Sequence, residues 1–183
     1  MDFELVLKTL ISEFSRLEIR CAVIGGFALG VLGAPRQTMD LDFLVHRDDL
    51  QKLDCSLTTL GYSRVFQSEN VSQYRHSEAA WGSVDFVHAF RKISLAMLDR
   101  AKDYPAFGGK QSLRTAQPED IIGLKVQAMS NDPERRAQEQ NDIERLMDQY
   151  GNRLDWGRIQ EFYDVFGLGE EARTLRGRFD HAE

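Results

Sequence analysis

The chain has 183 residues, of which 42% are hydrophobic and 28% charged, a composition typical of globular proteins and not of disordered chains. Its formal net charge is −6, which argues against a protein that coats nucleic acid through general electrostatic attraction. The two cysteines, Cys21 and Cys55, form no CxxC motif, so a disulfide framework and a zinc ribbon are excluded.

The sequence also argues against a membrane protein. No apolar run reaches the roughly 18–20 residues that a spanning helix needs, and the first residues carry acids where a signal peptide carries bases. We therefore expect a soluble, cytoplasmic protein with no membrane partner.

The first half of the chain predicts alternating helices and strands. Apolar residues recur at three- and four-residue steps over 3–19, which indicates an amphipathic helix. A short apolar run then ends at two glycines, as a buried strand ends in a turn. In chain order we expect a helix over 3–19, a strand over 21–24, a helix over 27–32, a strand over 40–45 and a helix over 48–60.

The predicted pattern changes near residue 117, from mixed strands and helices to helices alone. Residues 62–78 favour one or two strands, 84–89 another strand, and 93–101 a short helix. From residue 117 onward only helices are expected, over 118–129, 132–150, 156–166 and 170–179. The fold class is therefore α+β: a short mixed sheet flanked by helices (1–116), with a C-terminal helical region (117–183) packed on that core.

Three aspartates form the strongest candidate site. Asp40 and Asp42 are two residues apart on the expected strand, so both carboxylates point to one face. Neighbouring like charges repel unless something neutralises them, and oxygen donors of this kind suit Mg²⁺ or Mn²⁺. Asp85, on the strand over 84–89, would complete a two-metal site. The alternative is a solvated pair of acids on a strand edge; the apolar residues around the motif favour a buried strand.

Two glycines precede this motif by about fifteen residues. Gly25 and Gly26 provide either a simple tight turn or bare backbone amides that let a triphosphate approach closely. Arg36 and Thr38, just before the aspartates, either contact phosphate or order the loop. Lys125 falls within an apolar helical stripe, where it needs a partner such as a nucleotide phosphate or an acid like Asp142, unless its head reaches water.

The segment GGFALGVLGAPRQTMDLDFLV, followed by VDFV, resembles the DNA polymerase β-type nucleotidyltransferase superfamily. That pattern has a Gly-Gly or Gly-Ser turn, an acid-x-acid strand and a later third acid. The run from Arg36 to Asp42 is similar to that of AbiEii-type nucleotidyltransferases, many of which are toxins of toxin–antitoxin pairs. Gly26 stands where many members carry serine, which leaves phosphate binding to backbone amides and basic side chains.

The resemblance extends over roughly residues 20–148 and implies a role for each matching residue. The segments PEDIIGLK and QNDIERL look like the lysine and acid motifs of the AbiEii type. By resemblance, the catalytic residues are Asp40, Asp42, Asp85, Lys125 and Asp142. The implied metal ligands are Asp40, Asp42 and Asp85, and the implied nucleotide-binding residues are Gly25, Gly26, Arg36, Thr38 and Lys125.

Together these features predict a Mg²⁺- or Mn²⁺-dependent nucleotidyltransferase. It would transfer NMP from an NTP to an acceptor hydroxyl and release pyrophosphate. The sequence leaves the acceptor open between RNA such as tRNA, a protein side chain and a small molecule, and an antitoxin is an implied protein partner. The alternative function is a non-catalytic nucleotidyltransferase-fold module that binds a nucleotide or a protein; three intact acids argue against it.

Overall fold

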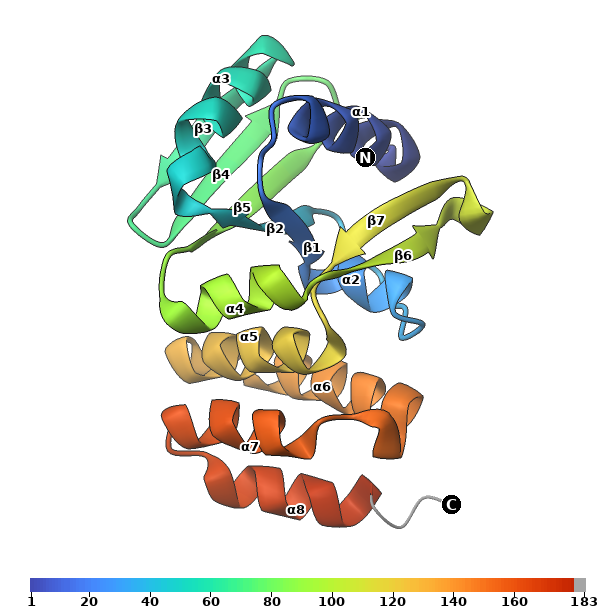
Figure 1. Ribbon diagram of the computed structural model, residues 1–183, viewed down its shortest axis with the longest axis vertical. Coiled ribbons are helices and arrows are strands. Elements are labelled where there is room, and N and C mark those ends of the chain that lie inside the picture. Colours follow the sequence, from blue (N-terminus) through green and yellow to red (C-terminus); the bar gives the residue numbers. More distant parts are fainter. Residues whose placement is uncertain (180–183) are drawn as a thin grey trace. The chain divides into compact units, whose positions relative to one another are not determined.

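The computed structural model describes residues 1–179 and shows two compact units. Unit 1 comprises Met1–Val31 and Pro35–Ala116, and unit 2 comprises Leu32–Ala34 and the described residues from Gln117 onward. Unit 1 is a mixed α/β structure, whereas unit 2 is helical (Figure 1). No helix among residues 1–179 combines the length and the apolar character needed to cross a membrane.

Unit 1 contains a seven-stranded mixed sheet in the order β3-β4-β5-β2-β1-β7-β6. The pairs β2·β5 and β1·β7 are parallel, and the other neighbours are antiparallel. The helices of unit 1 are α1 (Phe3–Arg16), α2 (Gly25–Val31), α3 (Leu50–Thr59) and α4 (Lys92–Arg100). The strands are β1 (Cys21–Ile24), β2 (Leu41–His46), β3 (Tyr62–Gln67), β4 (Val71–His76), β5 (Ser83–Ala89), β6 (Lys102–Ala106) and β7 (Gln111–Thr115).

One face of the sheet carries the aromatic core of unit 1. Phe43 on β2 and Phe86 on β5 stack with ring centroids 5.5 Å apart, and Phe14 of α1 meets both rings edge-on. Tyr74 of β4 contacts the same Phe86 ring and donates a hydrogen bond of 3.0 Å to Asp54 of α3. Helices α1 and α3 therefore cover this face, and the alternate residues of β2 and β5 point to the opposite one.

The predicted elements are found, with corrections at their ends. Helix α1 stops at Arg16 rather than at residue 19, because Glu18 adopts a positive φ of 54° that an α-helix cannot continue through. Helix α2 already begins at Gly25. Residues 62–78 form two strands, β3 and β4, and the strand predicted over 84–89 is found as β5, in which buried and partly exposed residues alternate.

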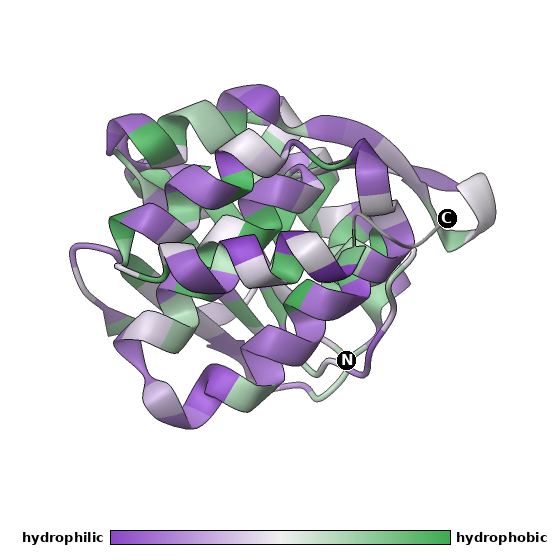
Figure 2. Ribbon diagram, turned by 90° about the horizontal axis from the view of Figure 1, so that it is seen from below, coloured by the Kyte–Doolittle hydropathy of each residue, from purple (hydrophilic) through white to green (hydrophobic). Residues whose placement is uncertain are grey.

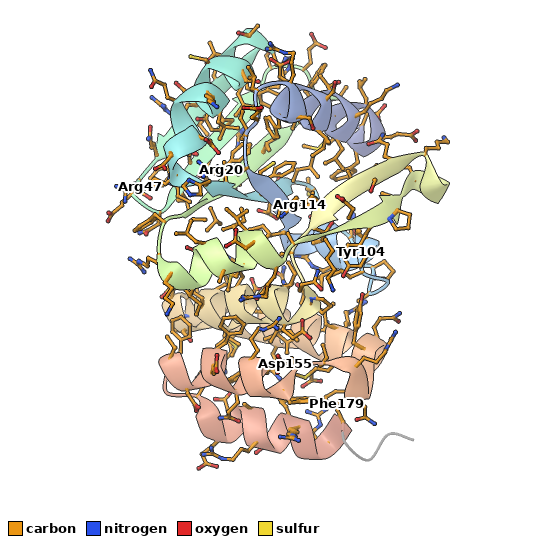
Figure 3. All side chains as sticks on the ribbon, in the orientation of Figure 1. Arg20, Arg47, Tyr104, Arg114, Asp155 and Phe179 are labelled. Carbon is orange, nitrogen blue, oxygen red and sulfur yellow. The ribbon has the colours of Figure 1, made fainter. Side chains whose placement is uncertain are left out.

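Two strands were not predicted. The hairpin of β6 and β7 lies at one edge of the sheet. Strand β6 contains Pro105 and buries none of its residues, so its sequence shows no alternation of apolar and polar residues that would predict a strand. A hydrogen bond joins this hairpin to α4: the guanidinium of Arg114 on β7 (Figure 3) donates to the carbonyl oxygen of Leu98 at 3.0 Å.

Unit 2 consists of α5 (Pro118–Asn131), α6 (Arg136–Tyr150), α7 (Trp156–Val165) and α8 (Gly169–Phe179). Helix α5 packs against both α6 and α7, and α7 packs against α8. Close approach of α5 and α7 depends on Gly123, where a Cβ atom would lie 2.7 Å from the ring of Phe162. These helical ribbons carry both hydrophilic and hydrophobic residues, as amphipathic helices do (Figure 2).

Candidate active site

Two of the three predicted aspartates lie side by side on the sheet. Asp42 of β2 and Asp85 of β5 are register partners in the parallel ladder, so their side chains leave the same face of neighbouring strands about 4.8 Å apart. This face is opposite to the aromatic core, and both residues are partly accessible. The row continues through Gln73 of β4, the antiparallel partner of Asp85, and through Ile24 of β1, the partner of Asp42.

Asp40 does not belong to the strand on which we expected it. The ladder of β2 begins at Leu41, its register with β5 begins at Leu41 and Val84, and Asp40 lies in the exposed bend just before it. The same-face argument therefore fails for Asp40, because the alternation of a strand does not extend into a bend. Its negative charge is nevertheless close enough to Asp85 to raise the pKa of that carboxyl.

The carboxyl group of Asp85 is held by a residue that sequence reasoning missed. Gln73 Nε2 donates a hydrogen bond of 2.7 Å to Asp85 Oδ2. Burial raises the pKa of Asp85 above its ordinary value and Asp40 adds to the rise, whereas the Gln73 hydrogen bond and the positive charge of Arg75 oppose it. No motif distinguishes Gln73 in the sequence; only the β4·β5 register places it beside Asp85.

The first glycine of the turn makes room for an aspartate. Gly25 has a φ of +67°, and a Cβ atom built on it would lie 1.9 Å from Oδ2 of Asp42 and 2.5 Å from its Cγ. The Asp42 carboxylate thus lies directly against the backbone of the turn. Any side chain at position 25 would displace it, which explains why this position requires glycine.

The second glycine makes room for two polar side chains. A Cβ atom on Gly26 would lie 2.8 Å from both Arg36 Nη2 and Thr38 Oγ1. The loop before β2 holds these groups through internal hydrogen bonds: Arg36 Nη1 donates to the carbonyl of Gln37 at 2.8 Å, and Thr38 Oγ1 to that of Asp40 at 3.3 Å. A guanidinium and a hydroxyl therefore occupy the space that a serine at position 26 would enter.

Asp40, Asp42 and Asp85 do not form a complete three-carboxylate metal site. Within residues 1–179, no group of three or more His, Cys, Asp or Glu side chains is placed so that it could hold a metal ion. The structure brings together Asp42 and Asp85, with Asp40 near enough to interact electrostatically. Their role as metal ligands stays a prediction.

Lys125 and Asp142 meet in unit 2. The ammonium of Lys125, which is 5% exposed, donates to Asp142 Oδ2 at 2.6 Å and to Glu139 Oε2 at 2.9 Å. Arg135 also pairs with Glu139, so two cations face two acids in this cluster between α5 and α6. An acid such as Asp142 is thus a partner of Lys125, and pairing with Asp142 and Glu139 offsets the cost of burying a lysine in an apolar stripe.

Comparison with known proteins identifies the class. A family model described as an uncharacterised nucleotidyltransferase matches residues 3–173. The chain therefore belongs to this nucleotidyltransferase family, and its class is that of a nucleotidyltransferase enzyme. No curated protein shows significant sequence similarity to the chain.

Solved structures agree with this fold. The antibiotic-resistance factor ANT(2'')-Ia matches with a TM-score of 0.67 and 14% identity over 97% of this chain and 99% of its own. The lincomycin-bound lincosamide antibiotic adenylyltransferase LnuA matches with a TM-score of 0.57 and 16% identity, over 78% of this chain and 95% of its own. A nucleotidyltransferase-like protein from Paracoccidioides brasiliensis matches with a TM-score of 0.58 and 16% identity, over 96% of this chain and 92% of its own. The predicted fold class, a mixed sheet flanked by helices with a C-terminal helical region, is confirmed.

Proposed function

We propose that the protein transfers NMP from an NTP to an acceptor hydroxyl in a reaction that depends on Mg²⁺ or Mn²⁺. The observation that carries the proposal is the in-register pair Asp42 and Asp85, with Asp42 lying against the Gly25-Gly26 turn. Adjacent carboxylates on one sheet face are costly unless a cation shares them. Burial raises the pKa of Asp85 and the negative charge of Asp40 adds to the rise, so a bound cation would also stabilise the ionised form of this carboxyl group.

The donor set fits Mg²⁺ without a complete protein cage. This ion is ordinarily bound by one or two carboxylates, with water and substrate phosphates filling the other positions. Asp42 and Asp85 would supply two carboxylates, and Asp40, whose charge acts on Asp85, is the candidate for a third. When bound, the metal would neutralise phosphate charge and lower the pKa of the acceptor hydroxyl.

Residues around the turn and on the sheet would bind the triphosphate and accept the proton of the acceptor hydroxyl. Arg36 and Thr38, which lie over Gly26, would offer a positive charge and a hydroxyl to the triphosphate. The acceptor oxygen attacks the α-phosphorus, the bond to the β-phosphate breaks, and pyrophosphate leaves. The hydroxyl proton passes to the Asp85 oxygen that Gln73 does not hold.

The acceptor remains open between RNA such as tRNA, a protein side chain and a small molecule. ANT(2'')-Ia has been solved with adenylyl-2''-tobramycin, so this fold accommodates small-molecule products. The AbiEii-type resemblance, the toxin role, the antitoxin partner and the cytoplasmic location stay predictions, as does a role of Lys125 and Asp142 in catalysis.

A titration separates the enzyme from a non-catalytic binding module. Mn²⁺ binding is followed by electron paramagnetic resonance with and without ATP, and pyrophosphate release is measured in the same samples with cell extract as acceptor source. We expect Asp42→Asn and Asp85→Asn to weaken Mn²⁺ binding and stop release, while Asp103→Asn, an exposed acid on β6, changes neither. Tight binding of Mn²⁺ and ATP without release would favour the module.

A further inference from the structure

A β-bulge in the edge strand β3 determines which face of the sheet its phenylalanine occupies. The pairing of β3 with β4 skips Val65, because Phe66 is the register partner of Gln73 and Val65 has no partner. In an unbroken ladder Val65 would pair with Gln73, and Phe66 would point to the opposite face. The bulge therefore turns Phe66 to the face that carries Gln73 and Asp85, as bulges beside active sites re-aim side chains.

One row of register partners extends from the aspartates to this ring. Asp85 pairs with Gln73 and Gln73 with Phe66, so Phe66 lies two strand spacings from Asp85, or about 10 Å. The next row on the same face holds Val71 and Val87, a register pair that is only partly buried. The face beside Asp85 is thus an accessible surface with apolar residues on two strands and an aromatic residue at its outer edge.

The side chain of Phe66 is available to a ligand. The residue is 50% exposed, which is unusual for a large apolar side chain. Within residues 1–179, no aromatic ring and no guanidinium stacks on it. Exposed apolar residues on an edge strand promote aggregation, so the place of this one in line with the aspartates favours a role in binding.

Arg75 adds one positive charge to the same face. It lies one strand across and two residues along from Asp85, at about 8 Å, on an exposed part of β4. It forms no ion pair within the part of the chain that the structure describes. Its charge reaches the site, because burial raises the pKa of Asp85 and Arg75 lowers it.

This single charge matches one kind of phosphate better than another. A phosphodiester carries one negative charge, which Arg75 neutralises. A terminal phosphate carries about −1.5 to −2 and would leave excess negative charge beside the aspartates. The surface therefore fits a ligand with a flat ring and a phosphodiester, which is the chemistry of a nucleotide within a polynucleotide chain.

We propose that this face of β5, β4 and β3 binds the acceptor, and that the acceptor is the 3′-terminal nucleotide of a single-stranded RNA. The inference rests on the proposed function and names its acceptor. The base stacks on Phe66, the phosphodiester on the 5′ side of the ribose lies at Arg75, and the 3′-hydroxyl reaches Asp85.

The resulting step lengthens the RNA by one nucleotide. The 3′-oxygen forms a bond to the α-phosphorus of the NTP, the bond to the β-phosphate breaks, pyrophosphate leaves, and the hydroxyl proton passes to Asp85. Every base presents a flat face that stacks on an aromatic ring, so the surface selects an RNA end and not a sequence. Phe66 is then a determinant of acceptor affinity, separate from the residues that bind the NTP.

Two RNAs that differ only in their last base test the proposal. One is a short 5′-labelled single strand, and the other has the same sequence with an abasic ribose at its 3′ end. Extension by one nucleotide in NTP and Mg²⁺ is followed on a sequencing gel. Phe66→Leu keeps an apolar side chain and loses the flat ring, and we expect it to lower kcat/KM for the intact RNA by about 5- to 100-fold while the abasic RNA is unaffected. Arg75→Gln should slow both RNAs and reduce the slope of log affinity against log salt concentration, measured by fluorescence anisotropy, by about 0.7.

Two matched controls lie at the other edge of the sheet. Phe107→Leu, at the tip of the β6·β7 hairpin, and Lys102→Gln, on β6, should change neither rate. Equal slowing of both RNAs in Phe66→Leu would make the ring structural, and equal rates of the wild-type protein on both RNAs would remove base stacking; either result overturns the inference. Label that moves from an α-labelled NTP only to protein or small molecules of a cell extract, with neither RNA extended, would overturn it and leave the proposed function intact. Absence of transfer to any acceptor would remove the proposed function, and the inference with it.

Discussion

Substituting Gly25 by alanine should damage the site and the fold together. A non-glycine residue at a φ of +67° costs about 1–2 kcal/mol, and the new methyl group would lie 1.9 Å from Oδ2 of Asp42. Relieving that overlap by moving a packed side chain costs roughly 1–3 kcal/mol more. The sum is about 2–5 kcal/mol, which for a chain of this size lowers Tm by roughly 5–15 °C.

The assay is a thermal melt combined with Mn²⁺ titration. Gly30→Ala is the matched control, because Gly30 lies in the same helix at an ordinary φ with no atom within 4 Å of its Cβ position. That variant should be neutral or gain up to about 1 kcal/mol. In an Asp42→Ala background the Gly25→Ala substitution should cost less, since the overlapping carboxylate is gone. A Gly25→Ala protein that melts with the wild type and binds Mn²⁺ equally would refute this reasoning.

Three further predictions concern the acids and their partners. Because the pKa of Asp85 is raised in the folded protein, its carboxylate destabilises the fold at neutral pH, and that penalty is relieved as the pH falls through the raised value. Asp85→Asn should therefore raise Tm near pH 7 and lose this advantage below about pH 4; a gain that is the same at every pH in melts from pH 3 to 8 would contradict it. Gln73→Leu removes the hydrogen bond that lowers this pKa, so the acid limb of the pH–rate profile for transfer should move to higher pH, and an unmoved limb would show that Asp85 is not the base. Lys125→Met leaves Glu139 and Asp142 buried without the ammonium, and urea unfolding should show a loss of about 3–5 kcal/mol; wild-type stability with lost NTP binding would instead favour the catalytic role implied by the resemblance.

The elements with strong local patterns could be predicted from the sequence. The apolar run at β1, the alternation of β5 and the proline-led start of α5 each come from forces that act within one segment. The hairpin of β6 and β7 could not, because its strands are short, polar and stabilised by pairing with a distant strand through the contact of Val23 with Thr115.

The sequence likewise indicates only some features of the candidate site. The spacing of the aspartates suggested a shared face, but only the β2·β5 register shows that Asp42 and Asp85, rather than Asp40 and Asp42, are the adjacent strand pair. Gln73 comes from a segment far from the motif, so no local pattern could indicate it. The fit of Arg36 and Thr38 over Gly26 likewise needs three-dimensional placement.

The most direct test of the account is to follow the α-phosphate itself. Each of the four NTPs, labelled at the α-phosphorus, is incubated with the protein, Mg²⁺ and cell extract, and the label is traced to RNA, protein or small molecules. We expect transfer by the wild-type protein, none when the label is at the γ-phosphorus, and none with Asp42→Asn or Asp85→Asn, although both variants remain folded. Transfer that persists in both variants, or label that never leaves the NTP in the presence of the wild-type protein, would contradict it.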